Sequence, residues 1–141
     1  MARHELREVH ASPDGFTAWT LRQMRRLARE DVERLRPLAL RLTGGERTPA
    51  AAARLHGFVR SEIAYLPDPV LEDGTPVELV RSPVECLEDG EGDCDDQVCL
   101  LGCLALGAAL PAAAVAVATT DGPFEHVFGE IVAGGHSWPA D

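Results

Sequence analysis

The sequence contains no lysine, and glutamine occurs only at Gln23 and Gln97 among its 141 residues. A lysine amine and a glutamine side chain are the two partners of an ordinary isopeptide cross-link. A chain without lysine therefore cannot supply the lysine amine of an ordinary isopeptide cross-link between copies of itself. Tyrosine is also scarce, because Tyr65 is the single example.

Long hydrophobic runs are absent as well. No apolar stretch is long enough to span a bilayer, and the N-terminus MARHELREVHASPDG is polar and lacks the apolar core of a signal peptide. We therefore expect no membrane association and a cytoplasmic protein, or one released without a signal, for instance inside a phage particle. In a reducing compartment the four cysteines are expected to be free thiols.

Charge is divided unevenly along the chain. The net charge is −10, with +5 in residues 1–61, which hold 12 of the 13 arginines, and −15 in residues 62–141. The acidic second half argues against nucleic acid as a ligand. An arginine-rich helix in the first half is compatible with a nucleic-acid face, but a solvated helix face is the simpler interpretation. We expect no nucleic-acid partner.

The length suits one domain with one hydrophobic core. Residues 1–16 are expected to form a loose arm ahead of a single domain at residues 17–141. Apolar residues at helical spacing predict helices over residues 18–43 and 49–65. Residues 66–83 are rich in proline and acid, which predicts a surface loop with little regular structure.

The helix starts and the C-terminal strands give further local signals. Helices are expected to begin after Thr48 and Ser82, because each precedes a proline. Residues 94–108 predict an apolar helix. Strands are predicted at 112–119 and 125–133, followed by a turn and the start of a third strand. Helices first and an antiparallel hairpin last is the order of an α+β protein.

The string GDCDD places Cys94 among three aspartates where the apolar helix begins. Gly92 permits an unusual backbone angle just before it. A cysteine at a helix N-terminus faces unpaired backbone N–H groups and the positive end of the dipole, which lowers the pKa of the thiol. Asp95 and Asp96 suit the first turn and need not point at the sulfur. Asp96 is expected to cap the helix or to form a salt bridge, with Arg81 as one partner.

A nucleophilic thiol needs a base, and the base needs a group that orients it. His126 is the obvious base, because it lies on a predicted strand after the cysteine helix and shares a face of that strand with Phe128. Asp141 follows after a turn, where a neighbouring antiparallel strand would bring it alongside His126. A cysteine at a helix end, with His and Asp on adjacent strands, is the geometry of thiol acyl-transfer enzymes.

The motifs IAYLPDPV, RSP, GDCDD, HVFGE and WPAD occur in this order within residues 17–141. Together they resemble the transglutaminase-like cysteine protease superfamily, in particular its small bacterial and prophage members. The pattern of that family is I-x-Y-x-x-D-P, R-x-P, G-D-C-D-D, H-V-(aromatic)-x-E and W-x-x-D. G-D-C-D-D together with H-V-x-x-E is fairly specific, whereas either motif alone is weak.

The resemblance implies a papain-like α+β fold, in which the nucleophile begins a central buried helix packed on a small antiparallel sheet. It makes Cys94 the nucleophile, His126 the general base and acid, and Asp141 the residue that orients His126. The implied reaction is acyl transfer through an acyl-enzyme, with the backbone N–H of Cys94 as an oxyanion donor. Tyr65 could supply a second donor and Trp138 could wall the site, although core packing explains each of them too.

Other site chemistry has less support. Cys99 and Cys103 lie at i and i+4 among leucines and are expected to be core thiols, and Cys86 is expected to be structural. No C-x-x-C pair occurs, so we expect no zinc site, and the aspartates do not fit a calcium loop. We expect neither a metal nor another cofactor.

Two functions remain open at this point. The first is thiol-dependent hydrolysis or acyl transfer on a protein or peptide substrate, with hydrolysis favoured over cross-linking. The second is a binding or structural role, for instance in a phage particle, for a protein that has the fold of this superfamily but no catalytic activity. The acidic stretches at 68–78 and 85–96 hint at a basic or amine-bearing ligand, although a solvated acidic rim explains them equally well. The substrate and the oligomeric state are not predicted.

Overall fold

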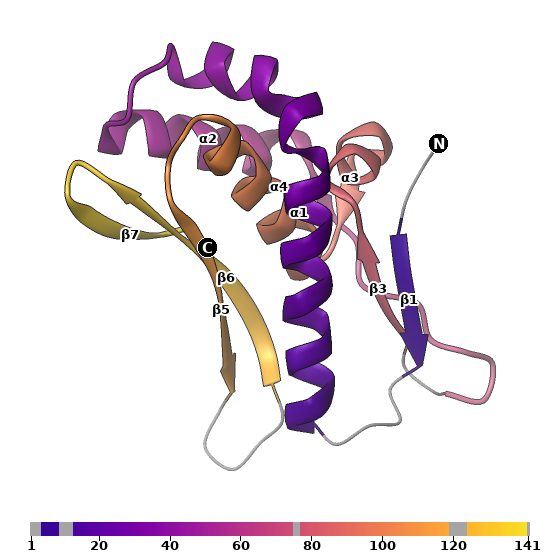
Figure 1. Cartoon of the computed structure of the whole chain (residues 1–141). Coiled ribbons are helices and arrows are strands. Elements are labelled where there is room, and N and C mark those ends of the chain that lie inside the picture. The colour runs from indigo at the N-terminus through magenta and orange to yellow at the C-terminus, as the bar shows by residue number, and fades with distance from the viewer. Residues whose placement is uncertain (1–3, 9–12, 75–76, 119–123, 141) are drawn as a thin grey trace.

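The computed structural model describes residues 4–8, 13–74, 77–118 and 124–140, and it has the predicted α+β architecture (Figure 1). Its helices are α1 (Pro13–Thr43), α2 (Pro49–Glu62), α3 (Pro83–Asp89) and α4 (Cys94–Gly107). Its strands are β1 (His4–Glu8), β2 (Ala64–Tyr65), β3 (Val77–Arg81), β4 (Glu91–Gly92), β5 (Ala112–Ala118), β6 (Phe124–Ala133) and β7 (His136–Ala140).

The central element is α4. It packs against α1, α2, α3 and β6, and a helix surrounded in this way is expected to be apolar on most faces. Leu100 and Leu104 are fully buried and share the core with Val127 and Ile131 of β6. The predicted buried helix is therefore confirmed. Among the described residues, no helix combines the length and the hydropathy needed to cross a membrane.

An antiparallel sheet covers one side of α4. Its strand order is β5-β6-β7, so each strand pairs with its neighbour in the chain. The register sets Val117 opposite His126 and Ile131 opposite Trp138. Figure 1 shows this sheet and the β1–β3 pair on opposite sides of α1.

Local signals explain where two of the helices begin. The hydroxyl of Thr48 accepts a hydrogen bond from the Ala51 N–H at 3.2 Å, and the hydroxyl of Ser82 accepts one from the Glu85 N–H at 3.2 Å. A proline follows each cap and supplies a helical backbone angle at the first position. Gly90 ends α3 in the left-handed conformation, with a φ of 69°. The predicted caps at Thr48 and Ser82 are confirmed.

Two stretches differ from what the sequence predicts. Residues 1–16, expected as a loose arm, contain β1 and the start of α1, and residues 66–83, expected as a loop, contain β3. The two strands pair antiparallel, with Leu6 opposite Leu79. Each is a strand because it pairs with a distant segment, and neither has a strong local pattern. The extent of the domain, residues 17–141, stays a prediction.

Candidate active site

Cys94 is the first residue of α4, and the aspartates on either side of it hold the helix start in place. Oδ1 of Asp93, the N-cap, accepts a hydrogen bond from the Asp96 N–H at 3.2 Å, and Oδ2 of Asp96 accepts one from the Asp93 N–H at 3.1 Å. This reciprocal capping box satisfies backbone donors that the helix itself leaves unpaired. Asp96 therefore serves the helix N-terminus, as the sequence predicts, together with Asp93, whereas a carboxylate oxygen of Asp95 lies 3.8 Å from the sulfur of Cys94.

Asp96 also ties α4 to β3. Its Oδ2 lies 2.7 Å from Nη1 of Arg81, and its Oδ1 accepts a hydrogen bond from the Arg81 backbone N–H at 2.7 Å. Asp96 is 0% exposed and Arg81 is 8% exposed, so the ion pair is buried. Burial raises the pKa of Asp96 to about 7, with Asp93 acting in the same direction and Arg81 against it. The predicted salt bridge is confirmed, and it fixes where α4 begins relative to β3.

Gly92 is needed for space rather than for an unusual backbone angle. It is not among the residues with a positive φ, which corrects the expectation from the sequence. A Cβ at this position would lie 2.6 Å from Cβ of Asp96 and 2.9 Å from its Oδ2. Because no side chain fits there unless Asp96 moves, the glycine allows the capping box to close.

A cavity of about 170 Å³ opens beside Cys94, between α2, α4, β6 and β7. Cys94 is partly buried, whereas Cys86, Cys99 and Cys103 are 0%, 2% and 0% exposed. The prediction that Cys99 and Cys103 are core thiols is confirmed, and Cys86, expected to be structural, is buried as well. Cys94 is the cysteine that a ligand in this cavity can reach.

Strands β6 and β7 run past this cavity. Val127 of β6 and Ala140 of β7 both line it, and they are 1% and 6% exposed. They are the chain neighbours of His126 and Asp141. The backbone amide of Val127 also lies near enough to the sulfur of Cys94 to lower the pKa of the thiol. The backbone of β6 therefore passes the cavity of Cys94 at the residue that follows the predicted base in the sequence.

Three predicted side chains lie outside the described part of the structure. The backbone of His126 lies in β6 and that of Trp138 in β7, without a description of either side chain, and Asp141 is outside the described residues. The catalytic roles of His126 and Asp141, and the wall formed by Trp138, stay predictions.

The described surroundings keep the Cys94 thiol protonated. Burial raises its pKa to about 12, with the charge of Asp95 acting in the same direction and the Val127 amide acting against both. Sγ of Cys94 lies 3.8 Å from Oδ1 of Asp95. The sequence predicts that the helix dipole lowers this pKa. That prediction is wrong for these surroundings, because desolvation and a close carboxylate outweigh the dipole. Formation of the thiolate requires a base.

Tyr65 lies beside the candidate nucleophile. It lines the same cavity and, in β2, pairs with Gly92 of β4, two residues before Cys94. Its side chain is 66% exposed, so packing in the core does not explain it. Partial burial raises the pKa of its hydroxyl, and Cys94 adds to the effect. The hydroxyl is therefore a hydrogen-bond donor at neutral pH.

Three carboxylates near Cys94 are close enough to share a cation. One oxygen from each of Asp68, Asp93 and Asp95 lies within 4.8 Å of the others. Burial raises the pKa of Asp93 to about 8, with Asp95 and Asp68 acting in the same direction. A protonated Asp93 can donate to Asp68, whose buried Oδ1 has no other hydrogen-bond partner among the described groups. A shared proton accounts for this cluster without a metal.

Two basic residues line the cavity. They are His56 and Arg60, one turn apart on α2, and within the described residues no carboxylate lines the cavity. Asp93 and Asp95 are only 7% and 2% exposed, so they do not form an acidic rim facing it. The sequence alone predicts no role for either basic residue, because their position depends on how α2 packs against α4. In the sequence, only their i, i+4 spacing indicates that the two residues lie on the same face of a helix.

Comparisons with known proteins bear on the fold. The chain matches no protein-family model and no curated protein. The crystal structure of a putative protease from Parabacteroides distasonis ATCC 8503 matches 86% of this chain and 26% of its own, with a TM-score of 0.69 and 14% identity. The crystal structure of a putative cysteine protease from Cytophaga hutchinsonii matches 78% of this chain and 37% of its own, with a TM-score of 0.57 and 18% identity.

The likeness to these solved structures concerns the fold. The chain spans 26% and 37% of their lengths, so the activities of those longer proteins do not transfer directly to it. The arrangement of helices around the small antiparallel sheet is common to them over most of this chain. The protein therefore has the α+β fold of these two solved structures, as the sequence predicts.

Proposed function

We propose that the protein is a cysteine hydrolase that acts on an amide of a protein or peptide through acyl transfer. Cys94 is the nucleophile, His126 is the general base and acid, and Asp141 orients His126. The observation that carries the proposal is the cavity beside Cys94, which is lined by the chain neighbours of both other residues. The fold shared with two structures named as proteases supports the same class.

The proposed reaction has two halves. His126 takes the proton from Cys94 as the sulfur attacks the amide carbonyl. The C–N bond then breaks, and His126 gives the proton to the leaving amine. Water attacks the resulting thioester with His126 again as base. The C–S bond breaks, the acid product leaves, and the proton returns to the sulfur of Cys94.

Two groups are available to stabilise the oxyanion that forms during each half. The backbone N–H of Cys94 belongs to the first turn of α4, where N–H groups have no partner within the helix. The hydroxyl of Tyr65, which lines the same cavity, is the proposed second donor.

The sequence motifs extend the proposal to the transglutaminase-like superfamily and to a bacterial or prophage setting. Hydrolysis is favoured over cross-linking, since the chain has no lysine to donate, and cross-linking of other proteins is the alternative within the same chemistry. A cytoplasmic or phage-particle location is part of this proposal.

One observation favours a second candidate function. The pKa of about 12 that the described surroundings give Cys94 suits an unreactive thiol. The protein would then be a catalytically silent binding or structural module with the same fold. The two candidates differ in whether Cys94 turns over an acyl group.

Hydrolysis of p-nitrophenyl acetate separates the two candidates. The wild-type protein is expected to release p-nitrophenol over many turnovers and, after an acid quench, to carry an acetyl group on Cys94 in peptide mass spectrometry. Cys94→Ala should abolish both signals, and His126→Ala should slow turnover by about 100-fold or more. Adding cadaverine to the reaction shows, from the products, how the acyl-enzyme divides between water and an amine.

The matched control is His136→Ala, which changes a histidine at the start of β7 and is expected to leave turnover unchanged. Circular dichroism of each variant checks that the fold is intact. If the wild type gives no turnover, or if His126→Ala matches it, the enzyme proposal fails and the binding module is supported.

A further inference from the structure

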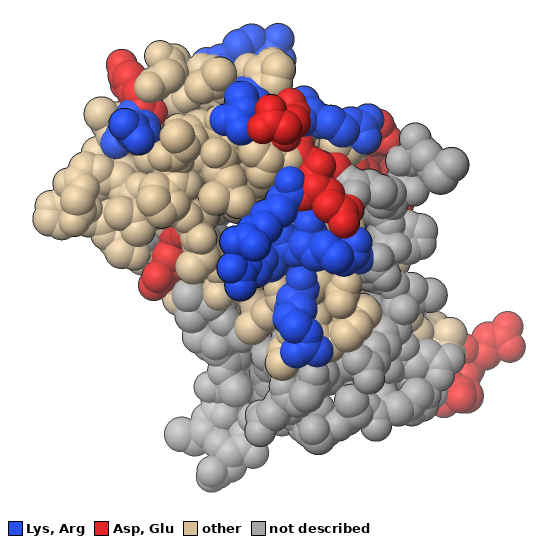
Figure 2. Space-filling model, in the orientation of Figure 1, with Lys and Arg blue, Asp and Glu red and all other residues tan. Residues whose placement is uncertain are grey.

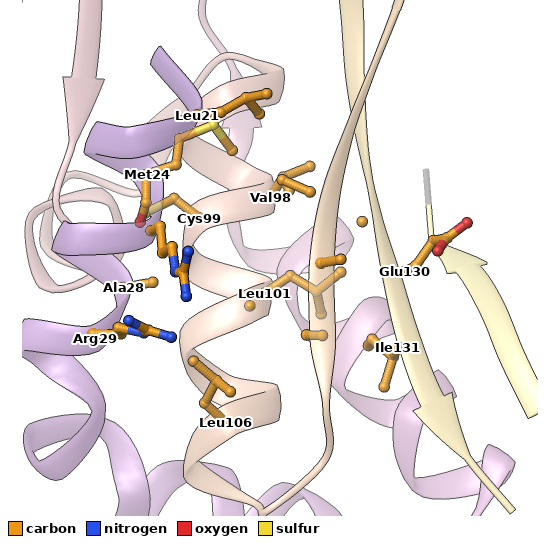
Figure 3. Close-up of a pocket in the computed structure, with 16 residues that line it drawn as sticks. Leu21, Met24, Ala28, Arg29, Val98, Cys99, Leu101, Leu106, Glu130 and Ile131 are labelled. Carbon is orange, nitrogen blue, oxygen red and sulfur yellow. The ribbon is translucent and has the colours of Figure 1, made fainter. Parts of the chain in front are cut away.

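A second cavity, of about 380 Å³, lies between α1, α4 and the β5–β6 pair (Figure 3). Its volume falls within the range of pockets that bind small ligands. Its walls are largely apolar and include Met24 of α1 and Ile131 of β6. Cys94 does not line it, while Val98 and Leu101 line both cavities and stand between them. The second cavity is therefore distinct from the candidate active site.

A glycine in the interior of α4 keeps this cavity open. Gly102 lines the cavity, and a Cβ at its position would have no atom within 4 Å. Glycine destabilises a helix interior relative to alanine, and no close approach of another group requires it here. Gly102 keeps the cavity open although it makes α4 less stable, which indicates that the cavity has a function.

Two arginines at the edge of the cavity have no carboxylate partner within the described residues. Arg25 and Arg29 lie one turn apart on α1, are exposed, and form no hydrogen bond or ion pair within the described residues. Their neighbour Arg26 does have a partner, Glu30, at 3.0 Å. Figure 2 shows basic side chains gathered over α1, and Figure 3 shows Arg29 reaching from α1 toward α4. The α1 edge of the cavity therefore offers two guanidinium groups to an anion.

The third charged residue of the lining is Glu130, whose side chain extends from β6 away from α1 (Figure 3). The positive charges of the lining thus lie on the α1 side and outnumber the negative one. A ligand with an apolar body and one anionic end matches this arrangement, because guanidinium groups form strong charge-assisted hydrogen bonds with carboxylates.

We propose that this cavity binds a free medium-chain carboxylate. Arg25 and Arg29 hold the carboxylate, and the alkyl chain lies against the apolar walls beside Gly102. The site needs neither Cys94 nor His126, so it stands or falls independently of the proposed hydrolase activity.

Monomeric decanoate is the probe for this site. Met24 lines the cavity, and Met1 is the other methionine of the chain, so a protein with ¹³C-labelled methionine methyl groups reports binding inside the cavity. Decanoate should shift the Met24 signal in a saturable way, and decyltrimethylammonium should bind about tenfold more weakly or worse. An unshifted Met24 signal at about 1 mM decanoate, or equal affinity for the two probes, would overturn the proposal.

A variant that fills the cavity tests the position of the alkyl chain. Gly102→Leu should abolish the binding of decanoate. Gly57→Leu on α2 is the matched control, because a Cβ there also meets no atom within 4 Å and the residue lies outside the cavity. Undiminished binding to Gly102→Leu would contradict the proposed site.

A charge variant tests the position of the carboxylate. Replacing both Arg25 and Arg29 with Gln should weaken the binding of decanoate by about tenfold or more. Replacing Arg22 and Arg34 with Gln should leave it unchanged, because these exposed arginines of α1 do not line the cavity. Equal losses in the two double variants would show a general charge effect and overturn the proposal. If Gly102→Leu does not fold, the charge variants still decide whether decanoate binds at the proposed site.

Discussion

Cys94 and Cys99 lie on the same helix, five residues apart, and their surroundings differ in most respects. Cys94 begins α4 and lines a cavity. Cys99 is 2% exposed, and its sulfur donates a hydrogen bond to the backbone oxygen of Met24 at 3.3 Å. Burial raises the pKa of both thiols, to about 12 for Cys94 and well above its usual value for Cys99. Burial alone would make both of them inert.

The difference between the two cysteines is therefore access and neighbours. Each cysteine lines a cavity, but Cys94 is partly exposed and has β6 beside it, whereas Cys99 is only 2% exposed. Its end of α4 depends on a few charged contacts, whereas the middle of the helix, around Cys99, depends on apolar packing. Substitutions in these two regions should differ in the size and in the sign of their effects.

The largest effect on stability is expected from Arg81→Ala, at the charged end. It leaves the carboxylate of Asp96 buried without its ion-pair partner, and breaking a buried pair costs about 3–5 kcal/mol. Urea denaturation measures the free energy of unfolding. Arg26→Ala is the control, since the side chains of the Arg26–Glu30 pair are 43% and 40% exposed, and a helix surface pair contributes about 0.5 kcal/mol. Equal losses in the two variants would mean that the buried pair does not hold the helix start.

Gly92→Ala should give the next largest effect. Its Cβ would lie 2.6 Å from Cβ of Asp96, so either the capping box or the preceding strand must shift. Overpacking of this kind typically costs about 1–3 kcal/mol, measurable in the same denaturation experiment. A variant as stable as the wild type would show that the helix start adapts easily.

Stability should also depend on pH through the carboxyl group of Asp93. Its pKa is about 8 in the folded protein against roughly 3.9 in an unfolded chain. Between these two pKa values the carboxyl group of Asp93 keeps its proton in the folded state and has lost it in the unfolded state. The free energy of unfolding therefore falls as pH rises. Asp96, with a pKa of about 7, acts in the same direction.

Asp93→Asn tests this assignment, because the amide oxygen can still cap α4 but the group does not titrate. Thermal melts of the wild type between about pH 5 and pH 8 should show a falling melting temperature, and the variant should show a shallower slope. Identical slopes would mean that Asp93 is not the titrating group.

The smallest effect should come from the apolar middle of the helix and should have the opposite sign. Gly102→Ala adds a methyl group where no atom lies within 4 Å, and alanine in a helix interior is more stable than glycine by about 1 kcal/mol. A raised melting temperature is the expected result. A lowered one would mean that the space around Gly102 is not open.

The features that could be predicted from the sequence have local causes. Thr48 and Ser82 cap helices through their own hydroxyls, and the aspartates around Cys94 cap α4 in the same way. The order of helices and strands follows from the spacing of apolar residues along the chain. These signals act over a few residues, so one sequence is enough to read them.

The features that could not be predicted depend on packing between distant segments. β1 and β3 are strands because they pair with each other, and His56 and Arg60 reach the cavity because of how α2 lies against α4. The pKa of Cys94 could not be predicted either. A helix dipole can be read from the sequence, but the burial that outweighs it cannot.

The central claim, that Cys94 is activated by His126, is tested most directly by iodoacetamide labelling of the native protein across pH, read by peptide mass spectrometry. The buried Cys86 and Cys103 are internal controls. If His126 activates Cys94, iodoacetamide should modify Cys94 rapidly below about pH 7. His126→Ala should then shift this labelling to higher pH, toward the pKa of about 12 that the described surroundings impose. Slow labelling of Cys94 at neutral pH, with the same profile in the wild type and in His126→Ala, would contradict the claim.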